Sequence, residues 1–245
     1  MTRLLVLQPG ADDPPARLGD WLTGAGAVLD VVRPYEQPVP ATLDGYRGLV
    51  VLGGAMGALD DLDHPWLADV RKLLSHAVAK RVPTLGVCLG AQLLAAATGG
   101  QVRRGPQGPE VGVLLVAKRD VAKDDPLFAD LPWTPDVLQF HEDEIALLPP
   151  SATLLASSPK YPNQAFRVGD HAWGVQFHVE TTPEVVLGWV AAAPGTAACA
   201  RPGEFDADRL ERGHEDIREV WEPFAARFVR LAAGELTIHR SLPLV

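Results

Sequence analysis

The chain has 245 residues and a formal net charge of -9, with 47% hydrophobic and 22% charged residues. This composition is typical of globular proteins, and the length suits one large core, so we expect a single domain over residues 1–245. A negative charge without a basic cluster argues against nucleic-acid binding. No apolar run reaches the roughly 18 residues that cross a bilayer, and the first residues do not resemble a signal peptide. We therefore expect a cytoplasmic protein without membrane contact.

Short apolar runs in the first half of the chain predict buried strands over residues 3–8, 27–33 and 48–52. Residues 14–25 predict a helix, and residues 64–81, with apolar side chains at helical spacing, predict another. Alternation of strand and helix is typical of a mostly parallel sheet covered on both faces. We therefore expect an α/β fold of the flavodoxin-like kind, with helices on both faces of a mostly parallel central sheet.

The next unit predicts a sharp turn from a strand into a helix. Residues 83–87 predict the strand and residues 91–98 the helix, which ends at Gly99-Gly100, and Cys88 lies at the turn between them.

The second half of the chain has shorter strand-like runs, separated by turns rich in Pro, Gly and Asp. This pattern predicts a small antiparallel sheet added to the parallel one. Beyond it, residues 191–202 predict a loop, and the charged segment 206–233 predicts a terminal helix within a C-terminal helical extension over about residues 203–235. The strand-like runs cover residues 111–117, 137–140, 153–156, 164–168 and 172–177.

Cys88 is a candidate nucleophile. A sulfur at a strand-to-helix turn lies near the N-terminus of the helix, where unpaired N–H groups favour a thiolate. Gly86 and Gly90 flank Cys88 as glycines flank serine in the G-x-S-x-G elbow of hydrolases. From these five residues alone, a buried core thiol is an equally good interpretation. Cys199 stands among small residues without such a setting, so we expect it to have no catalytic role.

His178 and Glu180 are the candidate base and its orienting carboxylate. A cysteine nucleophile needs a base, and the base needs a group that fixes its tautomer. The two residues follow the predicted strand 172–177 and lie two positions apart, so both side chains project to one side of an extended backbone. Alone, the pair is a weak signal that a solvated histidine also explains, but Cys88 upstream favours the catalytic interpretation.

The other histidines carry weaker signals. His141 follows a predicted strand and either orients a substrate or lies exposed. No tight ligand motif supports a metal site, so we expect neither a metal nor another cofactor. The remaining histidines are expected at the surface: His64, His76, His171, His214 and His239.

Amide hydrolysis passes through an oxyanion, which N–H donors must stabilise. The N–H of Leu89, directly after Cys88, is one candidate donor. The glycine turn Gly53-Gly54, after the strand 48–52, is expected at the same edge of the sheet and is the other. An ordinary strand-ending turn is the alternative for this glycine pair.

Together these residues resemble a known family. The chain contains, in order, VLGGAMGALDD, TLGVCLGAQLLAAATGG, VLQFHEDEIALLPPSATLLASS, NQAF and WGVQFHVE. Over about residues 45–185 they resemble class I glutamine amidotransferase domains, in particular the stand-alone type similar to the glutaminase part of GMP synthase. One departure is Val179, which stands where the family usually has a proline. We expect its effect to be small because a valine keeps the strand geometry.

The resemblance implies that Cys88 attacks the γ-amide carbon of glutamine, that His178 gives a proton to the departing ammonia, and that water hydrolyses a γ-glutamyl thioester. It implies Gly54 and Leu89 as the oxyanion donors. It also implies that Gln92 helps hold the substrate and that the backbone from Phe140 to Asp143 binds its amino-acid end. The substrate-binding residues that it implies are Gly53, Gln92, Phe140, His141, Glu142 and Asp143.

Three functions stay open at this level. One is a glutaminase whose ammonia passes to a separate synthase subunit, because the chain has no P-loop or nucleotide-binding fingerprint of its own. Another is a γ-glutamyl peptidase that acts on glutathione-like conjugates. The third is a non-catalytic binding or regulatory module that retains the fold.

Overall fold

The structure is a computed structural model and describes residues 1–236. Its centre is an eight-stranded sheet with strand order β2-β1-β3-β4-β12-β11-β10-β7. The parallel strands are β1 (Thr2–Leu7), β2 (Ala27–Val32), β3 (Gly48–Val51), β4 (Thr84–Val87) and β12 (Ala172–Val175). The antiparallel strands that extend the sheet are β11 (Ala165–Val168), β10 (Ala152–Ser157) and β7 (Ala117–Lys118).

The predicted small antiparallel sheet is confirmed, in two separate pieces. β5 (Gln101–Arg104) pairs with β9 (Asp143–Leu147), and β6 (Glu110–Leu115) pairs with β8 (Asp136–His141). The prediction of one strand over residues 111–117 is wrong, because the chain leaves β6 at residue 116 and joins the main sheet as β7.

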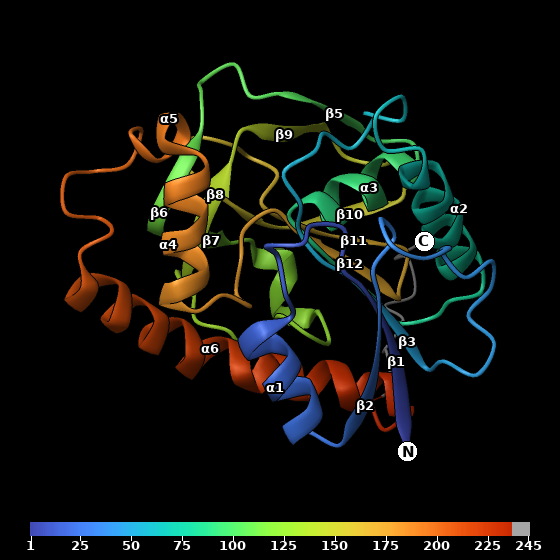
Figure 1. The fold of residues 1–245 in the computed structure, drawn as a ribbon. Helices are drawn as coiled ribbons and strands as arrows, with labels where there is room; N and C mark the ends of the chain where they lie inside the picture. The colour runs from blue at the N-terminus through green and yellow to red at the C-terminus, as the bar shows by residue number, and fades with distance from the viewer. Residues whose placement is uncertain (237–245) are drawn as a thin grey trace.

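Helices cover both faces of the central sheet, as predicted (Figure 1). α1 (Ala16–Gly24) and α6 (Ala207–Ala233) pack on one face, and α2 (Trp66–Ala79) and α3 (Leu89–Ala97) pack on the other. Strand β1 explains how two cores arise. Its side chains alternate, so Leu4 and Val6 join the core under α1 and α6, whereas Leu5 and Leu7 join the core under α2 and α3.

The C-terminal part contains more helix than predicted. α4 (Pro183–Ala192) lies mostly before the predicted loop, in a segment without a predicted element, and α5 (Pro194–Ala197) lies within that loop. A short helix η1 (Asp120–Asp124) precedes β8. Helix α4 lacks the polar face that marks most surface helices, so periodicity did not reveal it. Its start carries a signal, because Thr182 accepts a hydrogen bond from the N–H of Val185 and Pro183 stands at the first helical position.

The terminal helix α6 belongs to the core. Its buried face carries Leu210, Ile217, Trp221, Phe224 and Phe228 at helical spacing, and Trp221 packs edge-on against Phe224. Within residues 1–236, no helix is long and apolar enough to cross a membrane.

Candidate active site

Cys88 occupies a strained turn between β4 and α3. Its backbone has φ 50° and ψ -106°, a conformation that non-glycine residues rarely adopt. Two hydrogen bonds fix this turn in place. The N–H of Cys88 donates to the carbonyl of Val175 in β12 (2.8 Å), and the carbonyl of Cys88 accepts from the N–H of Gln92 (3.0 Å).

The glycines that flank Cys88 are sterically required. A Cβ on Gly86 would lie 2.5 Å from the carbonyl oxygen of Gly90, and a Cβ on Gly90 would lie 2.0 Å from that of Val51. Either contact is too close for real atoms. The first turn of α3 therefore lies directly against β3 and β4, which agrees with the sharp turn predicted from the sequence.

His178 and Glu180 lie side by side just after β12. The backbone of His178 pairs with Leu138 through two hydrogen bonds of 2.8 and 3.1 Å, which position the residue. Its ring Nδ1 lies 2.6 Å from Glu180 Oε1. The N–H of Val179 donates to the other carboxylate oxygen (2.9 Å), and a proline at this position would offer no such donor. The departure at Val179 thus adds a hydrogen bond to the carboxylate.

The surroundings of His178 favour its charged form. Burial alone would lower its pKa, but the negative charge of Glu180 and the neighbouring Cys88 raise the pKa well above the usual value. Because Nδ1 is bonded to Glu180, the nitrogen that faces the Cys88 thiol is Nε2. The arrangement can therefore hold a thiolate beside an imidazolium and move a proton between sulfur and nitrogen.

Gln176 is a further neighbour of the sulfur, and the sequence analysis missed it. It is buried, its Nε2 lies 3.7 Å from Cys88 Sγ, and its side-chain oxygen accepts a hydrogen bond from Gln92 (3.3 Å). A polar residue in a fully buried apolar segment needs hydrogen-bond partners. The glutamine within the apolar run 172–177 was therefore the sequence signal that could have identified it.

The two residues implied as oxyanion donors are neighbours. A Cβ on Gly54 would lie 2.8 Å from Leu89 Cδ2 and 2.6 Å from Met56 Sδ, so these segments are closely packed. Leu89 is the first residue of α3, where N–H groups have no partner within the helix.

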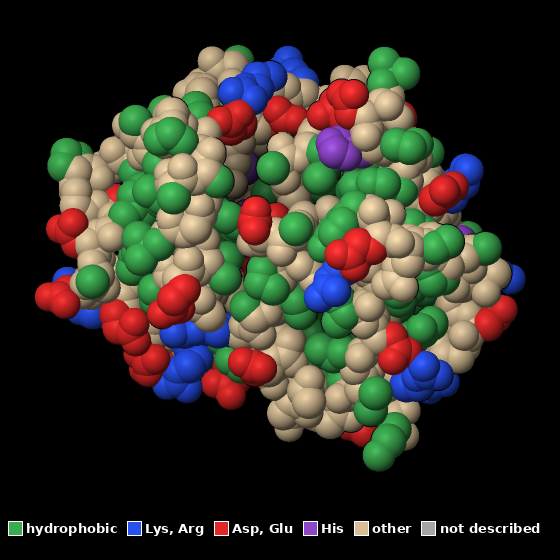
Figure 2. Space-filling model, viewed as in Figure 1, with side chains coloured by type: hydrophobic (Ala, Val, Ile, Leu, Met, Phe, Trp, Pro, Cys, Tyr) green, Lys and Arg blue, Asp and Glu red, His purple; other side chains and the backbone are tan. Residues whose placement is uncertain are grey.

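A cavity of about 730 Å³ opens above Cys88. It brings Cys88 and His178 together with Gln92 and with the turn between β8 and β9, from Phe140 to Asp143. The face drawn in Figure 2 is hollowed near its centre, with carboxylate side chains beside the hollow.

Three predicted residues do not line this cavity, and each supports a residue that does. Glu180 bonds to His178, and Leu89 packs against Gly54. Gly53 lies beneath the His178 ring, because a Cβ there would be 3.1 Å from His178 Cε1.

His141 lines the cavity, where a substrate would bind, and its predicted substrate-binding role stays a prediction. The ring is buried, which makes the alternative of an exposed ring wrong, and both of its nitrogens have partners. Nδ1 lies 2.8 Å from the carbonyl of Asp143, and Nε2 lies 3.2 Å from Glu110 Oε2. A buried carboxylate needs such contacts, so this ring serves Glu110 and leaves no nitrogen free for a substrate.

The acidic residues beside His141 are also partly engaged. Glu142 forms an ion pair with Arg104 and accepts a hydrogen bond from the hydroxyl of Thr196 in α5. Burial raises the pKa of Asp143, and Arg104 opposes that change.

Trp189 in α4 is a second residue missed by the sequence analysis. Its ring centroid lies 4.6 Å from that of His178 and 5.6 Å from that of Phe140. Its Nε1 donates to the carbonyl of Asp12 in the loop after β1 (2.9 Å). Trp189 therefore holds the His178 ring and the loop together. Asp13 in the same loop also lines the cavity and was not predicted.

The prediction of a surface position is wrong for His214. It lies on the buried face of α6, where Nδ1 bonds to the carbonyl of Leu210 (2.8 Å) and Nε2 to the hydroxyl of Thr181 (3.0 Å). Burial lowers its pKa. His64, His76 and His171 are partly exposed, and His239 lies outside the described residues.

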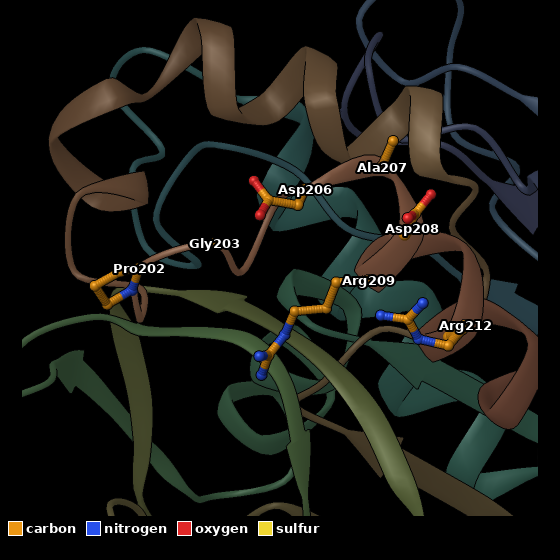
Figure 3. A pocket seen from close by; sticks show the side chains of 7 residues that line it. All are labelled: Pro202, Gly203, Asp206, Ala207, Asp208, Arg209 and Arg212. Atoms are coloured by element: carbon orange, nitrogen blue, oxygen red, sulfur yellow. The ribbon is translucent and has the colours of Figure 1, made fainter.

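A second hollow, of about 660 Å³, lies at the start of α6 (Figure 3). It holds none of the predicted site residues. Arg209, one of its cations, pairs with the buried Glu204 at 2.9 Å. Throughout residues 1–236, no three His, Cys, Asp or Glu side chains are grouped so that they could hold a metal ion.

Comparisons with known proteins bear on the family. The family model described as glutamine amidotransferase class-I matches residues 22–186. The chain belongs to the class I glutamine amidotransferase family. This family assignment confirms the resemblance found in the sequence.

The similar proteins include both gamma-glutamyl peptidases and GMP synthases. Gamma-glutamyl peptidase 5 of Arabidopsis thaliana is 28% identical over 197 residues, which are 80% of this chain and 78% of that protein. A GMP synthase [glutamine-hydrolyzing] of Thermomicrobium roseum is 36% identical over 134 residues, which are 55% of this chain but only 23% of that protein. A solved glutamine amidotransferase from Thermotoga maritima is 28% identical, has a TM-score of 0.82, and matches 93% of this chain and 98% of its own. The fold is therefore that of this family.

Proposed function

We propose that this member of the class I glutamine amidotransferase family hydrolyses the side-chain amide of glutamine and of related γ-glutamyl compounds, with Cys88, His178 and Glu180 as a catalytic triad. The observation that carries the proposal is the strained turn at Cys88, which presents a sulfur to a buried histidine already bonded to a glutamate. Strain of this kind tends to persist where function requires it.

In the proposed reaction, the Cys88 thiolate attacks the γ-carbonyl carbon and a tetrahedral oxyanion forms. The N–H groups of Gly54 and Leu89 stabilise that oxyanion. The carbon–nitrogen bond then breaks as the nitrogen takes a proton from His178 Nε2 and leaves as ammonia or an amine. Water, deprotonated by His178, attacks the thioester and releases glutamate. Glu180 keeps Nδ1 protonated and compensates the imidazolium charge.

The size of the cavity favours a second candidate activity, that of a γ-glutamyl peptidase. A volume of about 730 Å³ falls in the range of pockets that hold ligands larger than a single amino acid. The similarity to gamma-glutamyl peptidase 5 over most of both chains supports the same activity. If the substrate is glutamine instead, the ammonia released would pass to a separate synthase subunit.

Steady-state glutamate release from glutamine and from γ-glutamyl dipeptides tests these activities. We expect turnover by the wild type and a loss of at least about 1000-fold in Cys88→Ala. Cys199→Ala is the matched control, because this second cysteine is exposed and does not line the cavity. Faster hydrolysis of the dipeptides would identify a peptidase, and faster hydrolysis of glutamine an amidotransferase.

Acid-quenched protein provides an independent readout. Mass spectrometry should find one γ-glutamyl group on the peptide that contains Cys88. A wild-type protein that binds γ-glutamyl compounds but shows neither turnover nor this adduct would be the non-catalytic module instead.

A further inference from the structure

The loop that follows β1 is fixed at the edge of the cavity. The N–H of Gly10 donates to the carbonyl of Gly53 (3.3 Å), and Gln8 Nε2 donates to the carbonyl of Gly10 (3.1 Å). On its other side the carbonyl of Asp12 accepts from Trp189 (2.9 Å). The backbone that carries the next residue, Asp13, is therefore held from three directions.

Two glycines make room for the Asp13 carboxylate. A Cβ on Gly10 would lie 2.1 Å from Asp13 Oδ2, and a Cβ on Gly53 would lie 2.9 Å from Asp13 Oδ1. The carboxylate makes no side-chain hydrogen bond within residues 1–236, and it does not cap α1, whose N-cap is Pro15. The side chain is half-buried in the cavity wall, so its oxygens can accept hydrogen bonds from a molecule bound in the cavity.

The His178 ring, the proposed base, lies beside the same glycine as the carboxylate. The point where a Cβ on Gly53 would lie is 3.1 Å from His178 Cε1, so Cε1 and Asp13 Oδ1 are no more than about 6 Å apart. Cε1 lies between the two ring nitrogens, and Nε2 faces Cys88. Asp13, Cys88 and His178 also line the same cavity. The Asp13 carboxylate thus lies on the side where a departing nitrogen would receive its proton.

We propose that Asp13 accepts a hydrogen bond from the leaving nitrogen of the γ-glutamyl amide. This inference rests on the proposed function. The leaving nitrogen of glutamine carries two hydrogens and that of a substituted amide carries one, so each has an N–H to donate. With that N–H held by Asp13, the nitrogen lone pair is turned toward His178 Nε2. His178 supplies the proton when the carbon–nitrogen bond breaks, and Asp13 neither gains nor loses one.

The electrostatics of Asp13 set the pH range of this contact. Burial raises its pKa to about 6, the charge of His178 lowers it, and the charges of Glu180 and Asp12 raise it. The carboxylate form, which accepts the N–H, is therefore present above about pH 6 and lost below it.

The test compares an amide with an ester. Glutamine and the γ-methyl ester of glutamate share the acyl group, but the leaving oxygen of the ester has no N–H. In Asp13→Asn we expect the ratio of kcat/KM for glutamine to kcat/KM for the ester to fall at least about tenfold. In the wild type this ratio should rise with pH through about 6, and in Asp13→Asn it should be flat.

Asp12→Asn is the matched control, because it removes the same charge one residue away from an exposed side chain. Because the charge of Asp12 raises the pKa of Asp13, the comparison is made well above pH 6, where Asp13 is ionised in both proteins, and there the ratio should stay within about twofold of the wild type. If Asp13→Asn slows amide and ester equally, Asp13 supports the loop and the proposal is wrong. A flat wild-type pH profile of the ratio would also overturn it, even if Asp13→Asn failed to fold. If the wild type cleaves neither these two compounds nor γ-glutamyl dipeptides, the proposed function itself fails.

Discussion

Two buried histidines that line the cavity are each bonded to a glutamate, and we call their surroundings the His178 end and the His141 end. They differ in what the second ring nitrogen contacts and in how many partners the glutamate has. His178 has Nδ1 on Glu180 and its other nitrogen toward Cys88, whereas His141 has one nitrogen on a carbonyl and the other on Glu110. The carboxylate at the His141 end also accepts hydrogen bonds from other side chains. Glu110 is bonded to Ser158 (2.7 Å) and to Gln164 (2.8 Å).

This difference favours His178 over His141 as the proposed base. Both rings are buried and both have a carboxylate partner, so these two properties do not distinguish a base from a structural histidine. A base needs one nitrogen that is free to exchange a proton, and of the two rings only His178 has such a nitrogen, next to Cys88, the proposed nucleophile. The His141 end is a closed network that shapes the cavity wall. Substitutions at the two ends should separate these roles.

The largest effect is expected from His178→Phe. The phenylalanine ring keeps the contact with Trp189 but has no nitrogen, so kcat/KM for a γ-glutamyl substrate should fall about 1000-fold or more. Rates are to be measured at saturating and limiting substrate, together with urea unfolding. Activity within tenfold of the wild type would mean that another group serves as the base.

A smaller loss is expected from Glu180→Gln, on the order of 10- to 100-fold in kcat. Glutamine keeps the shape, but its amide group cannot accept both from His178 and from the N–H of Val179. Because the charge of Glu180 raises the pKa of His178, its removal lowers that pKa. The imidazolium that protonates the leaving group is then lost at a lower pH. The alkaline limb of the kcat/KM profile should therefore move to lower pH, and an unmoved limb would contradict this role.

The smallest effect on activity is expected from His141→Phe, the same substitution at the other end. Removing the ring nitrogens leaves Glu110 with its Ser158 and Gln164 contacts only, at a cost of about 1 to 3 kcal/mol in the free energy of unfolding. We expect kcat/KM to change by less than about tenfold. Urea unfolding and substrate kinetics would test both. A large loss of activity with unchanged stability would make His141 a substrate-binding residue, and the structural role given to it here would be wrong.

The features that were predicted correctly from the sequence depend on residues that are close together in the chain. The turn at Cys88 depends on glycines two positions away, and the contact between His178 and Glu180 depends only on an extended backbone. The parallel sheet followed from alternating strand and helix patterns in the same way. Local spacing was sufficient for each of these features.

What it missed depends on contacts between distant segments. Trp189 reaches His178 only because α4 folds back over the cavity, and Asp13 reaches the same ring from the end of β1. Neither residue is in a motif, so nothing nearby in the sequence distinguishes it. His214 is a different case. It lies four residues after Leu210 and three before Ile217, so helical spacing already placed it on the buried face of α6.

A series of hydrogen bonds links the backbone at Glu180 and Thr181 to α1 and α6. The carbonyl of Glu180 accepts from the N–H of Arg17 in α1 (2.9 Å), the Arg17 side chain bonds to the carbonyl of His214 (2.9 Å), and His214 bonds to Thr181. The family match ends at residue 186, so His214 in α6 lies beyond it. Fraying of the first turns of α6, which carry His214, would remove these contacts and loosen the backbone at Glu180 and Thr181. The resistance of the enzyme to heat would then be set by its last helix, and a chain shortened after residue 186 would retain every family motif but lose this support.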